Sequence, residues 1–373
     1  MNTKTYEPYR FFFPLGILFL LWGASVWVPL IWTGDDYPVL AHRYLMLNGF
    51  VSCFVGGFLM TAVPKFSQTW PAKSWEVLPL VFFTLMGVFF AYSEHSKEVF
   101  LISSIQPLLI LIFLVSRIFK RKANPPYSFL FIFVGLALWF ISAMLSLFVD
   151  EDAFKPLHYE GAICCLILGV GSRLIPGILG HIEIVQSQRS LYERPIPLLK
   201  TVPLHFAALI IIFIASYFSP EAMAAYMRGI VVVIIGLYYW RLYRAPQTKT
   251  ALTWCIWFSA WMILISFILK VLWADGAIHL GHSFFINGIV LLVLLIATRV
   301  IQSHGPQQAE LENRKRIYLV TFLLFMAACT RVFAFIMPDL YLSHLAYSAL
   351  MLLLAVVIWS ISYLKFIFCL PHK

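Results

Sequence analysis

The sequence predicts an all-α polytopic protein that crosses a membrane with about twelve helices and has little mass outside the bilayer. Hydrophobic residues make up 61% of the chain and charged residues only 12%, whereas charged residues are about 25% of a soluble domain. The apolar residues form continuous runs, not the alternating pattern of a membrane β-barrel. Basic residues gather in alternate connections between these runs, as membrane topology requires.

Twelve apolar runs are each long enough, or nearly so, to cross a bilayer, which takes about 20 residues. In chain order they are 11–32, 43–63, 76–93, 99–118, 127–149, 157–178, 201–218, 223–243, 251–273, 279–301, 317–336 and 341–366. The first run is longer than the apolar core of a signal peptide, so we expect it to be retained as a helix. We expect the whole chain, 1–373, to form a single integral membrane domain with the lipid bilayer as its main partner.

The distribution of charge predicts the orientation of these helices. If the N-terminus is cytoplasmic, most of the 27 Lys and Arg residues fall on the inner side, and outer connections such as 150–152 are acidic. We therefore expect a multi-pass protein of the inner (plasma) membrane with both termini in the cytoplasm. The net charge of +10 is explained by this topology and indicates no nucleic acid partner. The longer inner connections are predicted to be a polar loop, roughly 179–200, and a helical cap, 307–316.

Five histidines lie at predicted outer helix ends: His42, His158, His279, His282 and His344. The helices that begin near the first three are four helices apart, which predicts three repeat-like units of approximately 1–122, 123–249 and 250–373. Imidazole is the commonest metal ligand and the usual axial ligand of haem iron. Any one of these residues could simply be a histidine at a half-wet helix end, but the repeated set favours a cofactor site near the outer face.

Several basic residues near the helix ends have more than one interpretation. Arg331, within the eleventh segment, is expected either to bind an anionic group such as a haem propionate or to pair with Asp339. At the inner ends, Arg173 and Arg299 are expected to hold an anionic group or to extend toward lipid headgroups. His304, close to Arg299 in sequence, is a further candidate metal ligand.

Four segments of the chain resemble the NnrS family of membrane proteins, in the order in which the family has them. They are HRYLMLNGFVSCFVGGFLMTAVPKFSQTW, GSRLIPGILG, HSFFINGIVLLVLLIATRVIQSHG and TRVFAFIMPDLYLSHLAYSALMLLLAVVIW. The family is associated with nitric oxide stress and denitrification and is described as having twelve spans with haem and copper. The resemblance therefore implies a b-type haem, a small ligand such as nitric oxide, and a role in the response to nitrosative stress.

The resemblance extends to individual residues. The matching positions are His42, His282, His344, Arg173, Arg299, Arg331 and His304. Tyr44 and Leu45, however, stand where the family has a second histidine and a glutamate, which removes a metal ligand and an acid and weakens the case for copper. A looser likeness to the main subunit of haem-copper oxidases lacks that subunit's histidine pair on helix 7, so no proton-pumping oxidase is expected.

Two other functions compete with a haem-binding protein. A secondary transporter of a small anion would use Arg173, Arg299 and Arg331 and would also have twelve spans interrupted by Pro and Gly. A structural or assembly protein would need no ligand, and its histidines could be replaced without loss. The sequence does not indicate whether the protein is an enzyme.

Overall fold

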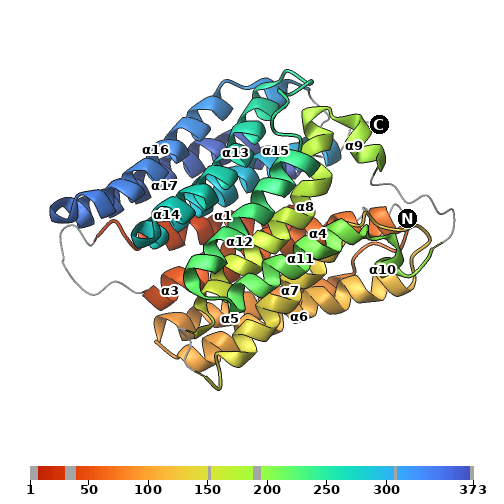
Figure 1. Cartoon of the computed structure of the whole chain (residues 1–373), viewed down its shortest axis with the longest axis horizontal. Helices are drawn as coiled ribbons and strands as arrows, with labels where there is room; N and C mark the ends of the chain where they lie inside the picture. Colours follow the sequence, from red (N-terminus) through yellow and green to blue (C-terminus); the bar gives the residue numbers. More distant parts are fainter. Residues whose placement is uncertain (1–6, 30–38, 150–152, 188–194, 306–308, 370–373) are drawn as a thin grey trace. The chain divides into compact units, whose positions relative to one another are not determined.

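The computed structural model describes residues 7–29, 39–149, 153–187, 195–305 and 309–369, and within these ranges the chain forms helices and no strand (Figure 1). Nine helical stretches in the described ranges are long and apolar enough to cross a membrane. Three shorter apolar helices, Tyr9–Ser25, Phe129–Leu145 and Leu204–Phe218, occupy the other predicted positions. The prediction of an all-α polytopic membrane protein is confirmed.

The chain divides into two compact units, each of which is described by itself. The first unit contains α1 (Tyr9–Ser25, as far as Gly23), α3 (Val39–Tyr44), η1 (Leu45–Val51), α4 (Ser52–Ser67), α5 (Ser74–Tyr92), α6 (Ser96–Phe119), α7 (Phe129–Leu145), η3 (Pro156–Gly161), α8 (Ala162–Leu179, as far as Arg173), α10 (Leu198–Thr201) and most of α11 (Leu204–Ala215). Within it α6 packs against α4, α5 and α7, so apolar helices cover several of its sides.

The second unit begins with the end of α8 and contains most of the remaining helices. They are the start of α9 (Ile182–Ser187), η4 (Ser216–Phe218), α12 (Glu221–Ile234), η5 (Ile235–Tyr239), α13 (Ala251–Leu272), η6 (Ala274–Gly276), α14 (Ala277–Ser283), η7 (Phe284–Val290), α15 (Leu291–His304), η8 (Ala309–Asn313), α16 (Arg316–Ile336), η9 (Pro338–Leu340) and α17 (Tyr341–Ile367). Here α16 and α17 pack side by side, and α13 packs against α12, α14 and η7.

Besides η5, which ends α12, three π-helical segments lie near the N-terminal end of a long helix in the described part of the chain. These segments are η1, η3 and η7, and they fall in the second, sixth and tenth predicted spans. Each lies at or just after one of the outer histidines, His42, His158 and His282. Single π-helical turns within α-helices are rare and frequent at functional sites. The three repeat-like units stay a prediction, which this correspondence supports.

Small residues bring α7 and α8 into backbone contact. A Cβ atom on Gly135 would lie 2.9 Å from the carbonyl oxygen of Ala162, and one on Gly169 would lie 2.9 Å from the Ile132 nitrogen. Close approach at small residues is a common way for membrane helices to pack, because lipid leaves them no hydrophobic driving force for association. This contact fixes Ser142 of α7 against the start of the α8 helix, where His158 lies.

Helix boundaries differ from the prediction in the connections. The first helix ends at Ser25 instead of residue 32. The predicted polar loop 179–200 contains two short helices, α9 and α10, and the predicted cap is a 3-10 turn at Ala309–Asn313. The acidic residues 150–152, on which part of the topology prediction rests, lie outside the described residues.

Candidate functional site

The five predicted outer histidines separate into two groups, one in each unit. His42 in α3 and His158 in η3 belong to the first unit. His279 and His282 in α14 and His344 in α17 belong to the second. Their surroundings decide which of them could bind a metal or cofactor.

His158 has the surroundings expected of a ligand. Its side chain is 1% exposed, and its Nδ1 atom lies 3.0 Å from the hydroxyl of Ser142. Its Nε2 atom is buried and has no hydrogen-bond partner among the described residues. Metal-bound histidines typically use one ring nitrogen for a second hydrogen bond, which fixes the ring and leaves the other nitrogen for the metal. The rings of Phe100 and Tyr159, 5.9 and 4.7 Å away between centroids, pack edge-on to the imidazole.

His42 lies at the end of a neighbouring helix in the same unit. Its Nδ1 atom is 2.7 Å from the carbonyl oxygen of Gly23. Because a carbonyl only accepts hydrogen bonds, Nδ1 bears the proton, and the lone pair of the neutral ring is on Nε2. The guanidinium of Arg43 lies 5.6 Å from the centre of the Tyr159 ring. The first unit thus brings together the two helix ends that bear His42 and His158.

In the second unit, Arg331 contacts His279. The Arg331 side chain is buried, and its Nη1 atom donates a hydrogen bond of 2.6 Å to Nδ1 of His279. The same Nδ1 atom lies 3.2 Å from the backbone carbonyl of Arg331, so both the side chain and the backbone of Arg331 contact this ring nitrogen. The predicted alternative, an Arg331–Asp339 ion pair, is wrong, because Asp339 is exposed and forms no ion pair among the described residues.

The ring nitrogens of His344 and His282, in the same unit, have different hydrogen-bond partners from those of His279. Neither nitrogen of His344 has a hydrogen-bond partner in the described part of the chain, although both are buried. The ring of His344 stacks on Phe333 of α16, with 6.3 Å between centroids. The Nδ1 atom of His282 donates to the carbonyl of Ile278 at 2.8 Å, which again leaves the lone pair on Nε2. Both ring nitrogens of His344 are therefore unpaired in the described part of the chain, whereas the Nδ1 atoms of His279 and His282 are engaged by the protein.

Lys270 is a basic residue of this region that sequence reasoning missed. A Cβ atom on Gly281 of α14 would lie 3.4 Å from its Nζ atom, so the ammonium group of α13 reaches the helix that bears His279 and His282. Its position within the predicted span 251–273 could have identified Lys270, because charged residues inside membrane spans are rare and often functional. Lys270 and Arg331 are thus two cations close to α14.

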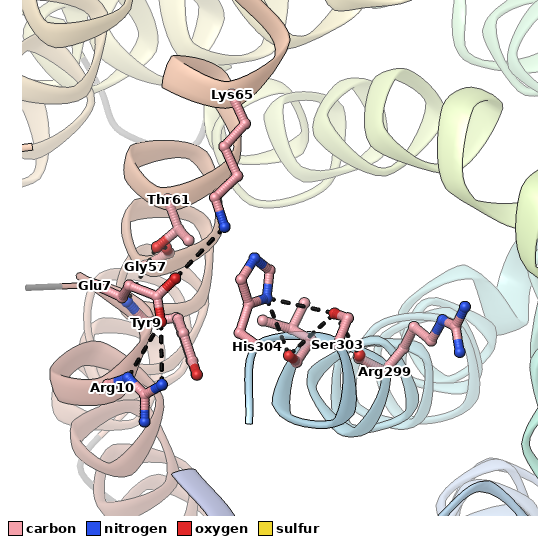
Figure 2. A network of polar contacts seen from close by, with 10 residues as sticks. Glu7, Tyr9, Arg10, Gly57, Thr61, Lys65, Arg299, Ser303 and His304 are labelled. Atoms are coloured by element: carbon pink, nitrogen blue, oxygen red, sulfur yellow. Dashed lines mark hydrogen bonds and ion pairs between the residues drawn. The ribbon is translucent and has the colours of Figure 1, made fainter. Parts of the chain in front are cut away.

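The predicted inner-end residues are engaged locally. Arg299 forms an ion pair with Glu312 and donates to Gln302 at 2.7 Å. The Nδ1 atom of His304 donates to the carbonyl of Val300 at 3.1 Å, and the ring lies next to the Ser303 hydroxyl (Figure 2). Arg173 lies 5.9 Å from the centre of the Phe66 ring. These contacts are those of residues that fix the helix ends.

A separate polar network at the start of the chain holds α1 to α4. Glu7 pairs with Arg10 at 3.1 Å and with Lys65 at 3.4 Å, and the hydroxyl of Thr61 accepts a hydrogen bond from the Tyr9 backbone (Figure 2). Its residues are all engaged with one another, so it is explained as helix packing.

A buried amide pair in the first unit was also missed by sequence reasoning. In η1, the Nδ2 atom of Asn48 donates to Oε1 of Gln106 at 2.6 Å, and Nε2 of Gln106 donates to the Thr84 hydroxyl at 2.7 Å. The matching residue of η7, Asn287, is fully buried, and neither side-chain atom has a partner among the described residues. In both segments the asparagine is followed directly by glycine.

The described residues contain no group of three or more His, Cys, Asp or Glu side chains that could hold a metal ion. Tyr44, where a second histidine would be needed, is buried, and its hydroxyl donates to the carbonyl of Thr84 at 3.0 Å. Leu45 is buried among apolar residues. The described residues therefore do not fit a copper site. His158 does fit a cofactor that needs only one or two histidine ligands, such as haem.

Comparison with known proteins gives the family. The family model described as NnrS protein matches residues 5–369, nearly the entire chain. A search of curated proteins finds no match. The nine apolar spans and three shorter apolar helices of the described ranges agree with this match along almost the whole sequence, and the chain belongs to the NnrS family.

Proposed function

We propose that this protein binds b-type haem in the membrane, that His158 and His42 would hold it, and that the protein acts in the response to nitric oxide. The observation that supports the proposal most directly is the buried Nε2 atom of His158, which lacks a partner while Nδ1 is held by Ser142. An uncompensated polar atom in a membrane interior is costly, so a ligand that satisfies it is favoured. Haem would supply an iron able to transfer an electron or bind a diatomic gas.

The residues around this site have separable roles in the proposal. The Ser142 hydroxyl orients the His158 ring, and the Gly23 carbonyl fixes the tautomer of His42. Phe100 packs beside His158 and keeps water from the imidazole. In the second unit, the unpaired nitrogens of His344 in α17 and the guanidinium of Arg331 in α16 lie on adjacent helices, which makes this the alternative haem position. Copper is not part of the proposal, because the described residues do not fit it.

The test is an absorption spectrum of detergent-purified protein, oxidised and then reduced with dithionite, together with haem and metal analysis. We expect a Soret band with sharp reduced α and β bands. His158→Ala should abolish it, whereas His95→Ala, which removes an exposed histidine, should leave it unchanged. Ser142→Ala should retain haem and shift its midpoint potential, because the ring loses its orienting hydrogen bond.

The controls make the outcome decisive. If His344→Ala removes the Soret band and His158→Ala does not, the site is in the second unit and the assignment to His158 is refuted. If the fully haem-supplemented protein has no Soret band, the haem proposal fails as a whole. Nitric oxide can bind the iron only where one of the two histidines leaves it, so its addition to the reduced protein should shift the Soret band as His42 is displaced. An unchanged spectrum would reject the role in binding that gas.

The proposal includes an orientation with both termini in the cytoplasm of a plasma-membrane protein. The supporting observation is the excess of basic residues on one set of connections. In a variant without native cysteines, Glu98→Cys should react in intact cells with a maleimide that cannot cross the membrane, and Lys249→Cys should not. The reverse result would require the opposite orientation.

A further inference from the structure

Two connections of the second unit pack against each other at the end of the helices that we predict to be cytoplasmic. The backbone nitrogen of Gln247 donates to the Leu179 carbonyl at 2.8 Å. Gly180 has a φ of +89°, and a Cβ atom at this position would lie 3.0 Å from that of Gln247. A side chain other than hydrogen would therefore be strained and crowded here. The contact places the residue that follows, His181, beside the connection between η5 and α13.

His181 is completely buried and has no hydrogen-bond partner. Its side chain is 0% exposed, and neither Nδ1 nor Nε2 has a partner among the described residues. Buried side-chain polar atoms are nearly always satisfied, because leaving one unpaired costs about 1–3 kcal/mol. Two such atoms on one imidazole, outside the membrane-spanning segments, indicate that a group other than the described protein residues belongs beside the ring.

Arg241, on the connection between η5 and α13, also has a buried side-chain atom without a hydrogen-bond partner among the described residues. Its Nη1 atom donates to the Tyr243 hydroxyl at 2.6 Å, but its Nε atom is buried without a partner among the described residues. The φ of Arg241 is +54°, a left-handed conformation that is uncommon for a residue other than glycine. Backbone strain of this kind persists only where the surroundings enforce it, and it is concentrated at functional sites.

The strained segment is held in place by two tryptophans of α13. The indole nitrogens of Trp257 and Trp261 both donate to the carbonyl of Leu242, at 2.9 and 3.1 Å. The Leu242 nitrogen in turn donates to the Gly236 carbonyl at 3.1 Å. The residue next to Arg241 is thus fixed from both sides, so the position of the Arg241 backbone is preorganised before any ligand arrives.

The charges around His181 are mainly positive. Burial has the largest effect and lowers the pKa of His181; Glu183 opposes it, and Arg244 and Arg241 lower the pKa further. Glu183 is already paired with Arg244, at 3.0 Å, and both side chains are about half exposed. The guanidinium of Arg241 has no carboxylate partner among the described residues, so its positive charge and its buried Nε donor remain uncompensated near the imidazole.

We propose that His181, Arg241 and Arg244 form a binding site for a phosphate group at this connection of the second unit. An oxyanion accepts hydrogen bonds at several oxygens, so it can satisfy the unpaired Arg241 Nε donor and an imidazole N–H together, and guanidinium groups suit it in charge and geometry. The phosphate could be a free ion or the headgroup of an acidic phospholipid, since anionic lipids are enriched in the cytoplasmic leaflet. The site is independent of the proposed haem site.

The first experiment titrates inorganic phosphate into the detergent-purified full-length protein and follows its melting temperature, with sodium chloride at matched ionic strength as the reference. Phosphate should raise the melting temperature in a saturable way, and chloride should not. Arg241→Gln should weaken phosphate binding at least tenfold. The control Lys249→Gln removes one charge from an exposed position on the same connection and should leave binding unchanged.

A second experiment distinguishes the two sources of phosphate. It uses only the wild-type protein, so its result does not depend on whether a variant folds. Wild-type protein in nanodiscs of phosphatidylcholine is compared with protein in discs that contain phosphatidylglycerol, and calorimetry measures phosphate binding directly. Stabilisation by phosphatidylglycerol alone identifies a lipid headgroup, and a calorimetric signal for phosphate identifies the free ion. If neither ligand binds, or if Arg241→Gln and Lys249→Gln weaken binding equally, the proposed site is refuted.

Discussion

The paired asparagines of η1 and η7 provide a test in which the same substitution should have opposite effects. Asn48 is satisfied by Gln106, whereas Asn287 is buried without a partner among the described residues. Leucine has the same number of side-chain heavy atoms as asparagine and the same branching at Cγ, but no polar atoms. Asn48→Leu should therefore destabilise the protein, and Asn287→Leu should stabilise the ligand-free protein.

The magnitudes follow from the contacts. Asn48→Leu removes the 2.6 Å hydrogen bond and leaves the Oε1 atom of Gln106 unpaired in an apolar interior. Single hydrogen bonds between membrane helices average about 0.6 kcal/mol, and an unsatisfied buried group costs about 1–3 kcal/mol, so we expect a loss of about 1–2 kcal/mol. Asn287→Leu removes two unsatisfied atoms and should gain a similar amount, about 1 kcal/mol.

The assay is reversible unfolding in mixed micelles by increasing mole fractions of SDS, followed by tryptophan fluorescence. A double-mutant cycle of Asn48→Leu with Gln106→Leu should give a coupling free energy of about 1 kcal/mol, since the two residues share one contact. The reasoning is refuted if both asparagine variants destabilise the protein to the same extent. That result would mean that Asn287 has a partner in the folded protein after all.

Three further substitutions have expected outcomes that follow from single contacts. Glu76→Gln should destabilise the protein by about 3 kcal/mol in the same SDS assay, because it leaves the fully buried Arg117, which donates to Glu76 at 2.7 Å, without its counter-charge. Gly87→Ala should reduce the yield of folded protein by size-exclusion chromatography, because the new Cβ atom would lie 2.0 Å from the Tyr44 hydroxyl. The pKa of His181 is lowered in the folded state by burial and by Arg244 and Arg241, against the opposing effect of Glu183. The unfolded chain therefore binds the proton more readily, and the contribution of His181 to stability is present above the ordinary histidine pKa of about 6.5 and is lost as pH falls below it. His181→Gln should reduce the drop in melting temperature between pH 7.5 and pH 5.5, and an unchanged drop would show that other groups cause it.

The helices could be predicted from the sequence because the membrane imposes a strong constraint. Continuous apolar runs must satisfy their backbone groups internally, so runs such as 251–273 correspond closely to α13. Helix ends were predicted less well, since the end of α1 at Ser25 depends on where the chain turns and not on hydropathy alone. The π-helical segments could not be predicted, because a π turn and an α turn have the same apolar composition.

The candidate site was predicted only in part. The histidines at helix ends could be identified from their repeated placement, and the basic residue Arg331 from its position within a span. Their partners could not, because Ser142 beside His158 and His279 beside Arg331 are contacts between different helices. The sequence left Asp339 as the nearest charge to Arg331 along the chain, and the true contact lies 52 residues away.

The π-helical segments allow the end of each helix that bears a histidine to change its orientation independently of the rest of the helix. A π turn accommodates one additional residue within a helix, and each residue of an α-helix turns the chain by about 100°. Loss of a single residue from η1 would return the segment to regular α-helix and rotate His42 by roughly that angle relative to α4, whose Gly57 packs on α1. The direction in which each histidine faces can therefore be changed by one insertion or deletion, while the lipid-spanning part of the helix keeps its packing.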